Sequence, residues 1–175
     1  MKSISRKISY LLRHDPEDLI IDNNGWVDIT DLINKLNISF NQLKEIVNTN
    51  DKKRFSFNKD LTKIRANQGH SIDIDVELIK KIPPKFLFHG TSLSNIKKIK
   101  RNGILKMNRN HVHLSLDSNT ALNVAKRHAK NNETFIFKID TFPMIIDNIN
   151  FYLSANNVWL VDYIDPKYLK YDKNN

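Results

Sequence analysis

The sequence predicts an α+β protein made of two lobes. Hydrophobic residues recur at helical spacing before residue 50, and short segments with β-strand alternation dominate after residue 83. The Pro83-Pro84 pair between these regions marks a boundary. Since 175 residues can form two small lobes with buried cores, we expect one lobe over residues 1–82 and another over residues 83–175.

The N-terminal lobe is expected to begin with an amphipathic helix. Ile4, Ile8 and Leu11 recur at helical spacing and give that helix one apolar face. The helix should end near Arg13-His14, because Pro16 disfavours helical backbone in the residue that precedes it.

Two more helices and a hairpin complete this lobe. After a turn and a short extended segment at 25–29, Thr30 is the expected N-cap of the second helix. Ser39 and Gln42 form a capping box that predicts a third helix. Residues 54–57 and 61–64 alternate around a polar turn and predict a hairpin. Three small helices closed by a hairpin are typical of a winged-helix-like lobe.

The C-terminal lobe alternates strands with helices. The strand expected at 86–88 runs into His89-Gly90-Thr91. A basic amphipathic helix follows, with Leu93, Ile96 and Ile99 facing inward and Gly103 just after its end.

Further strands follow in this lobe. The strand expected at 111–115 places its two apolar residues on one face and both of its histidines on the other. Ser118 is the expected N-cap of the next helix, and strands are expected at 135–139 and 158–161.

Positive charge is concentrated in particular segments. The formal net charge of +9 favours an anionic partner. Residues 1–50 are almost neutral, with six basic and seven acidic side chains. Residues 51–65 carry six basic and two acidic side chains, and this clustering favours a polyanionic ligand over a merely solubilising surface.

The composition excludes several classes of protein. Cysteine is absent, which excludes disulfides, thiolate metal sites and cysteine nucleophiles. The N-terminus leads into a charged amphipathic segment, not into the apolar core of a signal peptide. No run approaches the roughly 20 apolar residues that cross a bilayer. We therefore expect a cytoplasmic protein without a membrane partner.

Arg13-His14 is the first candidate for binding phosphate. A guanidinium offers five donors in a fixed geometry that matches a phosphate, and an adjacent imidazole can donate a hydrogen bond or carry a proton near neutral pH. The alternative is structural, because cations near a helix C-terminus stabilise the helix dipole.

Two other arginines have similar alternatives. Arg65 precedes the polar segment 67–71, in which Gly69 permits a positive φ and the polar side chains can bind a sugar or a base edge. An ordinary turn beside an exposed arginine is the other interpretation. Arg127 lies with Lys126 on the polar side of an expected helix, where a solvated surface is the alternative to a functional role.

His89-Gly90-Thr91 and His113-Leu114-Ser115 are candidates for binding a nucleotide. The first lies at the expected junction of a strand and a helix, where backbone N–H groups beside a glycine form an anion-binding site. His113 and Ser115 project from one strand face and can share a ligand. The alternatives are an N-cap at Thr91 and a histidine satisfied by neighbouring carbonyl groups.

In this order and combination, the motifs resemble those of the RNA 2′-phosphotransferase family, the NAD-dependent tRNA splicing phosphotransferases. The resemblance covers essentially the whole chain. Its most specific elements are Ile-Arg-Ala-Asn-Gln-Gly-His-Ser at 64–71 and His-Val-His-Leu-Ser at 111–115. Shorter matches lie at 4–14, 25–27, 88–91, 102–104, 107–110, 127–128 and 158–160.

The resemblance implies a winged-helix RNA-binding lobe and an ADP-ribosyltransferase-like lobe that binds NAD as a co-substrate. The catalytic quartet of the family corresponds to Arg13, His14, Arg65 and Arg127. Its NAD-binding elements correspond to His89, Gly90, Thr91, Gly103, His113 and Ser115. The chain departs from the family pattern where glycine is usual, at Ala125, Ala129 and Asn157.

The resemblance also implies a reaction in two steps. An internal 2′-phosphate of RNA attacks the anomeric carbon of NAD and expels nicotinamide. The adjacent ribose 2″-hydroxyl then attacks phosphorus, which releases RNA with a free 2′-hydroxyl and ADP-ribose 1″,2″-cyclic phosphate. A phosphate monoester is largely ionised near pH 7, with a second pKa of about 6, so arginines need only position it and no metal is required.

The expected partners follow from this reaction. They are NAD and a 2′-phosphorylated RNA such as a tRNA, and we expect a monomer. Charge clustering around the expected hairpin makes four residues the candidates for contacting the RNA backbone: Lys52, Lys53, Arg54 and Lys63.

Other functions fit some of these residues. His89-Gly90-Thr91 and His113-Leu114-Ser115 fit the paired His-x-Thr/Ser motifs of two-histidine RNA cyclic phosphodiesterases, which use one histidine as a base and the other as an acid. That function leaves the three arginines unexplained. A non-catalytic winged-helix binder with an ADP-ribose-binding appendage, and an ADP-ribosyltransferase acting on terminal phosphates of nucleic acid, are further alternatives.

Overall fold

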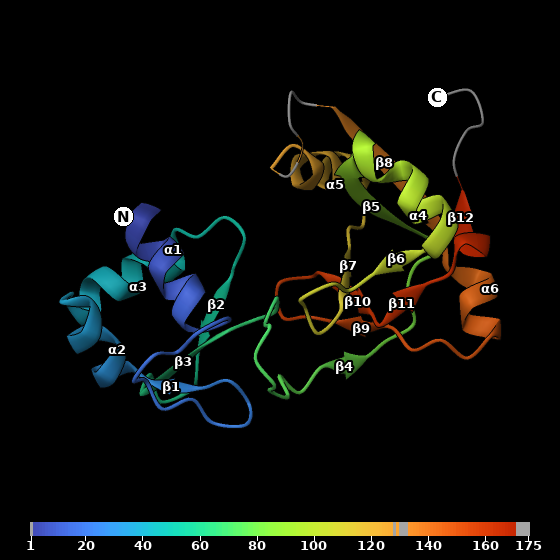
Figure 1. The fold of residues 1–175 in the computed structure, drawn as a ribbon. Coiled ribbons are helices and arrows are strands. Elements are labelled where there is room, and N and C mark those ends of the chain that lie inside the picture. The colour runs from blue at the N-terminus through green and yellow to red at the C-terminus, as the bar shows by residue number, and fades with distance from the viewer. Residues whose placement is uncertain (1, 128, 130–132, 171–175) are drawn as a thin grey trace. The chain divides into compact units, whose positions relative to one another are not determined.

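The computed structural model describes residues 2–127, 129 and 133–170 (Figure 1). The chain divides into two compact units, residues 1–78 (unit 1) and 79–175 (unit 2). The division precedes the boundary expected at Pro83-Pro84, because the short strand β4 (Ile79–Lys80) pairs with a strand of unit 2. No helix within the described residues is long and apolar enough to cross a membrane.

Unit 1 combines helices with a small antiparallel sheet (Figure 1). The helices are α1 (Lys2–Leu11), α2 (Ile29–Leu36) and α3 (Phe40–Asn48). The sheet has the order β1-β3-β2, formed by β1 (Val27–Asp28), β2 (Phe55–Phe57) and β3 (Lys63–Ala66). The predicted helices and hairpin are confirmed. The second hairpin strand begins at Lys63, not at Leu61, because Asn58 Oδ1 accepts hydrogen bonds from the Thr62 and Lys63 N–H groups and keeps this stretch in the turn.

One face of α1 holds this helix against the rest of unit 1. Ile8, Leu11 and Leu12 are fully buried and pack into the same core as the inner residues of α2, α3 and the sheet. Burial of each such side chain stabilises the fold by about 1.5–3 kcal/mol. The polar face of α1 therefore points away from the core, and Arg13-His14 follow the helix in a turn, as predicted.

Unit 2 is built from short sheets covered by helices (Figure 1). One sheet has the order β12-β8-β5, formed by β5 (Phe86–Ser92), β8 (Thr134–Asp140) and β12 (Leu169–Lys170). A second has the order β4-β9-β10-β7, with β7 (Val112–Leu114), β9 (Tyr152–Leu153) and β10 (Trp159–Val161). β6 (Ile104–Leu105) pairs with β11 (Tyr163–Ile164). The helices are α4 (Ile96–Asn102), α5 (Ser118–Ala125) and α6 (Thr141–Ile146), with short 3-10 turns at Leu93–Asn95 and Pro166–Tyr168.

Two helices begin with an aspartate N-cap where the sequence predicts a hydroxyl residue. Asp28 caps α2 and accepts from the Thr30 N–H, so Thr30 lies in the first turn. Asp117 caps α5 and accepts from both the N–H and the hydroxyl of Thr120, so Ser118 is the first helical residue. A carboxylate is favoured at this position because its charge complements the positive end of the helix dipole. The predicted Ser39–Gln42 capping box is confirmed.

The segment His89-Gly90-Thr91 lies inside β5 and not at a strand–helix junction, because β5 extends to Ser92 through its pairing with β8. A Cβ at Gly90 would lie 1.9 Å from the carbonyl oxygen of Ala121, so α5 packs directly on the backbone of β5 at this glycine. The same hypothetical Cβ would lie 3.1 Å from that of Ala125, a buried residue for which only a small side chain fits.

The start of α4 also differs from the prediction. Leu93 lies in the 3-10 turn before α4 and is 45% exposed, whereas Ile96 and Ile99 pack against the core as predicted. Thr91 is not an N-cap, since its hydroxyl accepts a hydrogen bond from the Asn95 amide at 3.1 Å. Gly103 follows α4 with φ 77°, as predicted.

Candidate active site

Arg13 and His14 are held in a tight turn at the end of α1. The N–H groups of Arg13, His14 and Asp15 all point to the carbonyl oxygen of Tyr10, at 3.2, 2.9 and 3.3 Å. Pro16 then takes the chain away from the helix axis. The turn fixes both side chains relative to α1.

Ser71 holds this turn from a distant part of the sequence. Its N–H donates to the carbonyl oxygen of Arg13 at 2.8 Å, and its Oγ lies 2.9 Å from Nδ1 of His14. The hydroxyl therefore sets the orientation of the imidazole. The sequence indicated Ser71 only as the last residue of the motif at 64–71. Nothing else in the sequence predicted its contacts with Arg13 and His14.

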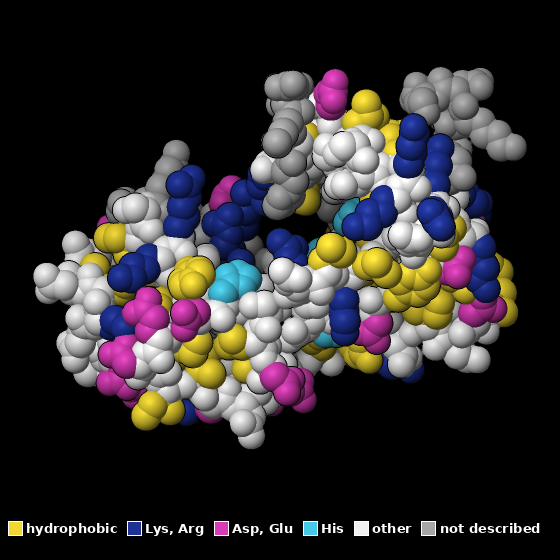
Figure 2. All heavy atoms as spheres, viewed as in Figure 1, with side chains coloured by type: hydrophobic (Ala, Val, Ile, Leu, Met, Phe, Trp, Pro, Cys, Tyr) yellow, Lys and Arg dark blue, Asp and Glu magenta, His cyan; other side chains and the backbone are white. Residues whose placement is uncertain are grey.

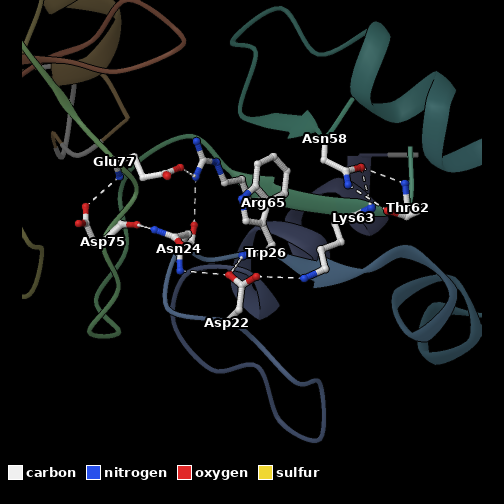
Figure 3. A network of polar contacts seen from close by, with 9 residues as sticks. All are labelled: Asp22, Asn24, Trp26, Asn58, Thr62, Lys63, Arg65, Asp75 and Glu77. Atoms are coloured by element: carbon white, nitrogen blue, oxygen red, sulfur yellow. Dashed lines mark hydrogen bonds and ion pairs between the residues drawn. The ribbon is translucent and has the colours of Figure 1, made fainter. Parts of the chain in front are cut away.

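Arg65 projects from the central strand β3 and is held by three contacts (Figure 3). Its guanidinium carbon lies 4.4 Å from the centroid of the Trp26 ring. Its Nη1 donates to the carbonyl oxygen of Asn24 at 3.2 Å and to Oε2 of Glu77 at 3.1 Å. The side chain is only 18% exposed, so Arg65 is not the exposed arginine of an ordinary turn.

The turn that carries Trp26 is organised by Asp22 and Gly25 (Figure 3). One carboxylate oxygen of Asp22 accepts from the N–H groups of Asn24 and Trp26, and the other lies 3.1 Å from Nζ of Lys63. Burial of the carboxylate opposes its ionisation, but these hydrogen bonds together outweigh that effect and lower the pKa of Asp22. Gly25 has φ 81°, and a Cβ there would lie 2.6 Å from the side chain of Ile74.

His70 is a buried group that links these residues. It is 3% exposed, and burial, together with the positive charges of Arg13, His14 and Arg65, lowers its pKa to about 3. The three members of the expected catalytic quartet that lie in unit 1 therefore all act on one neutral imidazole. Its Nε2 is buried without a hydrogen-bond partner among the described residues. The sequence showed His70 only as part of a motif.

Asn67 is used inside the fold. This residue is 6% exposed, its amide donates to the carbonyl oxygen of Lys53 at 2.6 Å, and its N–H donates to that of Arg54 at 2.8 Å. The polar side chains of 67–71 were expected to bind a sugar or a base edge. For Asn67 this expectation is wrong, because its amide nitrogen already donates within the fold. Asn67 fixes the loop before β2 against β3, while Gly69 has the expected positive φ of 88°.

The structure separates the four basic residues expected to contact RNA. Lys52 and Arg54 line a cavity of about 850 Å³ together with Arg13 and His14. Lys53 does not line it and has a positive φ of 41°. Lys63 also lies outside it and pairs with Asp22.

Unit 2 contains a cavity of about 500 Å³ lined by most of the residues that the resemblance assigns to NAD. These are His89, Gly90, Thr91, Gly103 and His113. Ser115 does not line it. Instead, its backbone exchanges hydrogen bonds with Phe88 at 2.8 and 2.9 Å, which brings the two histidine motifs together.

His89 contacts the strand of the second motif, whereas the ring of His113 contacts an arginine just before its own strand. Nδ1 of His89 lies 3.2 Å from the carbonyl oxygen of His113, and Nδ1 of His113 lies 3.0 Å from Nη1 of Arg109. His111 lines the same cavity, and its partial burial lowers its pKa although Asp162 opposes this shift. The imidazoles of His89, His111 and His113 thus line one cavity.

Several residues that line this cavity were missed from the sequence. Asn95, Lys98 and Asn102 contribute from the start and one face of α4, and Arg109 lies before β7. The spacing of three and four residues along α4 was a signal for a shared face, but polar helix faces are usually solvated. Only the cavity that α4 shares with residues of β5 and β7 identifies this face as a wall.

Arg127 belongs to unit 2, whereas the other three members of the expected quartet belong to unit 1. It lies in a turn after α5, where its N–H donates to the carbonyl oxygen of Val124 at 3.2 Å, and its side chain is exposed. The Ala129 N–H donates to the carbonyl oxygen of Ala125 at 2.9 Å, which links two of the positions where the family usually has glycine. His128, which completes the 127–128 match to the family, lies outside the described residues.

Comparison with known proteins identifies the family of the chain. The family model described as "RNA 2′-phosphotransferase, Tpt1 / KptA family" matches residues 1–163. A probable RNA 2′-phosphotransferase of Fusobacterium nucleatum is 49% identical over 96% of this chain and 97% of its own length. A probable RNA 2′-phosphotransferase of Flavobacterium johnsoniae is 44% identical over 97% of this chain and 96% of its own length. One of Burkholderia pseudomallei is 42% identical over 95% of this chain and 93% of its own length. The chain is therefore an enzyme that belongs to the RNA 2′-phosphotransferase, Tpt1/KptA family.

Proposed function

We propose that this enzyme removes an internal 2′-phosphate from RNA, with NAD as the co-substrate that accepts the phosphate. The observation that carries the proposal is the grouping of Arg13, His14 and Arg65 around the buried His70. Such a group of cationic donors favours a dianionic ligand. Family membership supports the identification of that ligand as the 2′-phosphate of RNA.

We assign different substrates to the two units. Unit 1 is proposed to be a winged-helix RNA-binding lobe, since its helices precede the antiparallel β2–β3 hairpin. Lys52 and Arg54 are its proposed RNA contacts, because they share a cavity with Arg13. Unit 2 is proposed to be an ADP-ribosyltransferase-like lobe that binds NAD.

The cavity of unit 2 suits a dinucleotide. Its volume of about 500 Å³ is typical of a ligand site, and Ile99 and Val112 give it apolar walls. Lys98 and Arg109 supply positive charge for a pyrophosphate. His113 adds a polar ring that can orient a ribose.

In the proposed first step, a 2′-phosphate oxygen forms a bond to the anomeric carbon of NAD while the bond from that carbon to nicotinamide breaks. The phosphate is already ionised at neutral pH, so the step requires positioning and not deprotonation. Arg13 and Arg65 are the proposed positioning groups. Arg65 must then exchange its contact with Glu77 for one with the phosphate.

In the proposed second step, the ribose 2″-hydroxyl loses its proton and attacks phosphorus, while the bond from phosphorus to the RNA 2′-oxygen breaks and that oxygen gains a proton. Negative charge increases on the phosphoryl oxygens, and the arginines, including Arg127, stabilise it electrostatically. His14 is the proposed proton carrier, because Ser71 fixes its ring.

The test is incubation with an RNA oligonucleotide that carries one internal 2′-phosphate, with and without NAD. We expect dephosphorylated RNA, nicotinamide and the cyclic ADP-ribose phosphate to form in equal amounts, and only with NAD. Arg65→Ala should slow the reaction at least about 100-fold, while Arg101→Ala, an exposed arginine outside the cavity on α4, should not. Release of phosphate from this RNA without NAD would contradict the proposal and indicate a phosphomonoesterase. Hydrolysis of a 2′,3′-cyclic phosphate end without NAD would favour the two-histidine phosphodiesterase.

A further inference from the structure

A cavity of about 850 Å³ in unit 1 extends from Arg13-His14 along α1. We propose that it is a track for the single-stranded RNA that flanks the 2′-phosphate, with Arg6, Lys52 and Arg54 contacting phosphodiester groups. This inference rests on the proposed function and deepens it, since it defines where the rest of the RNA binds.

One wall of the track is the polar face of α1. Ser5, Ser9 and Arg13 follow one another at intervals of four residues, and so do Arg6, Tyr10 and His14; all six line the cavity. Residues four apart lie above one another on a helix, so these two rows form one continuous strip. Arg6 lies about 10 Å along the helix from the Arg13-His14 turn. A strand with its 2′-phosphate at this turn would therefore reach Arg6 with a neighbouring nucleotide.

The opposite wall is the loop between α3 and β2, which has a fixed backbone. Asn50 Oδ1 accepts from the N–H groups of Lys52 and Arg54, and Asn50 Nδ2 lies 3.5 Å from Oγ of Ser5 across the cavity. The other side of the loop is held by Asn67. The two basic side chains thus start from a preorganised backbone, which reduces the entropy lost when RNA binds.

The charge of the track suits a polyanion. Within the described residues, neither Arg6 nor Arg54 forms an ion pair, and Asp51 is the one acidic residue that lines the cavity with them. In Figure 2, Lys and Arg side chains gather over the loop that leads into β2. A groove with this charge follows the backbone of a nucleic acid strand.

Tyr10 favours a single strand over a duplex. It is 49% exposed, lines the cavity, and its ring centroid lies 6.0 Å from that of His14. Exposed aromatic rings beside basic groups stack unpaired bases, which a duplex does not offer. Tyr10 is therefore the platform for the base next to the modified nucleotide.

The test compares two triple variants of the full chain that each remove three positive charges from unit 1. The track variant is Arg6→Ala/Lys52→Ala/Arg54→Ala, and the control is Lys7→Ala/Lys44→Ala/Lys59→Ala, whose residues do not line the cavity. Substrates are a 2′-phosphorylated dinucleotide and a ten-nucleotide single strand with the same internal modification. We expect the track variant to raise KM for both substrates by different factors. The factor for the longer RNA should be at least ten times the factor for the dinucleotide. The slope of log KM against log salt should fall by about 2, as for three lost phosphate contacts.

The track is overturned if both triple variants change KM for the longer RNA equally, or if the track variant affects both substrates to the same extent. Binding of an unmodified ten-nucleotide strand, measured by fluorescence anisotropy, tests the track without the reaction. Weaker binding by the track variant alone supports the track even if no phosphate is removed, an outcome that would refute the proposed function but not this inference. Equal binding by both variants refutes the track.

Discussion

The guanidinium of Arg65 stacks on the ring of Trp26, with its central carbon 4.4 Å from the ring centroid (Figure 3). Arg65 lies on β3 and Trp26 lies in the turn before β1, and the stack orients a long side chain that has many rotamers. Arginine favours such stacking because its charge is planar and weakly hydrated. Trp26 is therefore a positioning residue for Arg65.

Replacing Trp26 should lower kcat more than it raises the KM for RNA. Trp26→Ala removes a cation–π contact worth about 0.5–2 kcal/mol, which corresponds to a two- to thirtyfold loss of kcat. Trp26→Phe keeps an aromatic face and should restore most of it. Steady-state kinetics at saturating NAD measure both, and urea unfolding identifies any loss of folded protein. An equal loss for Ala and Phe would contradict a stacking role.

Removing the charge of Glu77 should tighten the binding of RNA. Oε2 of Glu77 lies 3.1 Å from Nη1 of Arg65 and competes with the phosphate for it. Glu77 is 62% exposed, so the pair is weak and we expect Glu77→Gln to lower KM for 2′-phosphorylated RNA only two- to fivefold. Asp75→Asn, which changes an exposed carboxylate of the same segment, is the control. A higher KM in Glu77→Gln would mean that the carboxylate holds Arg65 in its productive position.

Ser71 should act only through His14. We expect Ser71→Ala to lower kcat by about tenfold, because the imidazole loses the hydroxyl 2.9 Å from its Nδ1. In a His14→Ala background the same change should have almost no further effect on kcat. A double-mutant cycle measures this coupling, and strictly additive losses would show that Ser71 supports the site in another way.

The free energy of unfolding should depend on pH through His70. Above pH 6.5 the imidazole is neutral in both the folded and the unfolded protein. Below pH 6.5 the unfolded chain binds a proton, whereas the folded chain binds one only when the pH is about 3. Stability should therefore fall as pH decreases from 6.5 towards 3, with a slope of up to about 1.4 kcal/mol per pH unit from this group. His111, whose pKa is also lowered, adds to the slope in the same range.

Urea unfolding between pH 7 and 4.5 separates these contributions. His70→Gln should flatten the profile, and His111→Gln should flatten it less, since His111 is only partly buried. This range lies above the pKa values of the carboxylates, which contribute at lower pH. An unchanged slope in His70→Gln would show that His70 takes up a proton normally in the folded protein.

Local signals in the sequence predicted the elements that depend on neighbouring residues. Pro16 indicated the end of α1, and the Ser39 capping box indicated the start of α3. The extent of β5 was not predictable in this way, because its continuation through Gly90 depends on pairing with β8, more than 40 residues away. The contacts of Arg65 with Trp26 and Glu77 are similarly long-range.

The candidate site shows the same limit. The motif at 64–71 contains Ser71, which contacts Arg13 and His14, and the motif at 111–115 contributes His111 and His113 to the cavity of unit 2. They did not separate residues exposed to a ligand from those that hold the backbone, because the same polar types do both. Asn67 and Ser71 proved to be internal supports, and only their hydrogen bonds reveal this.

The anchoring of the loop before β2 by Asn67 has a consequence for substrate range. Asn67 donates hydrogen bonds to the carbonyl oxygen atoms of Lys53 and Arg54. These main-chain atoms are present whatever side chains the loop carries. Selection can therefore exchange the side chains of the loop without detaching it from the strand that bears Arg65. The RNA sequence that the proposed track accepts can therefore change without any change at Arg65.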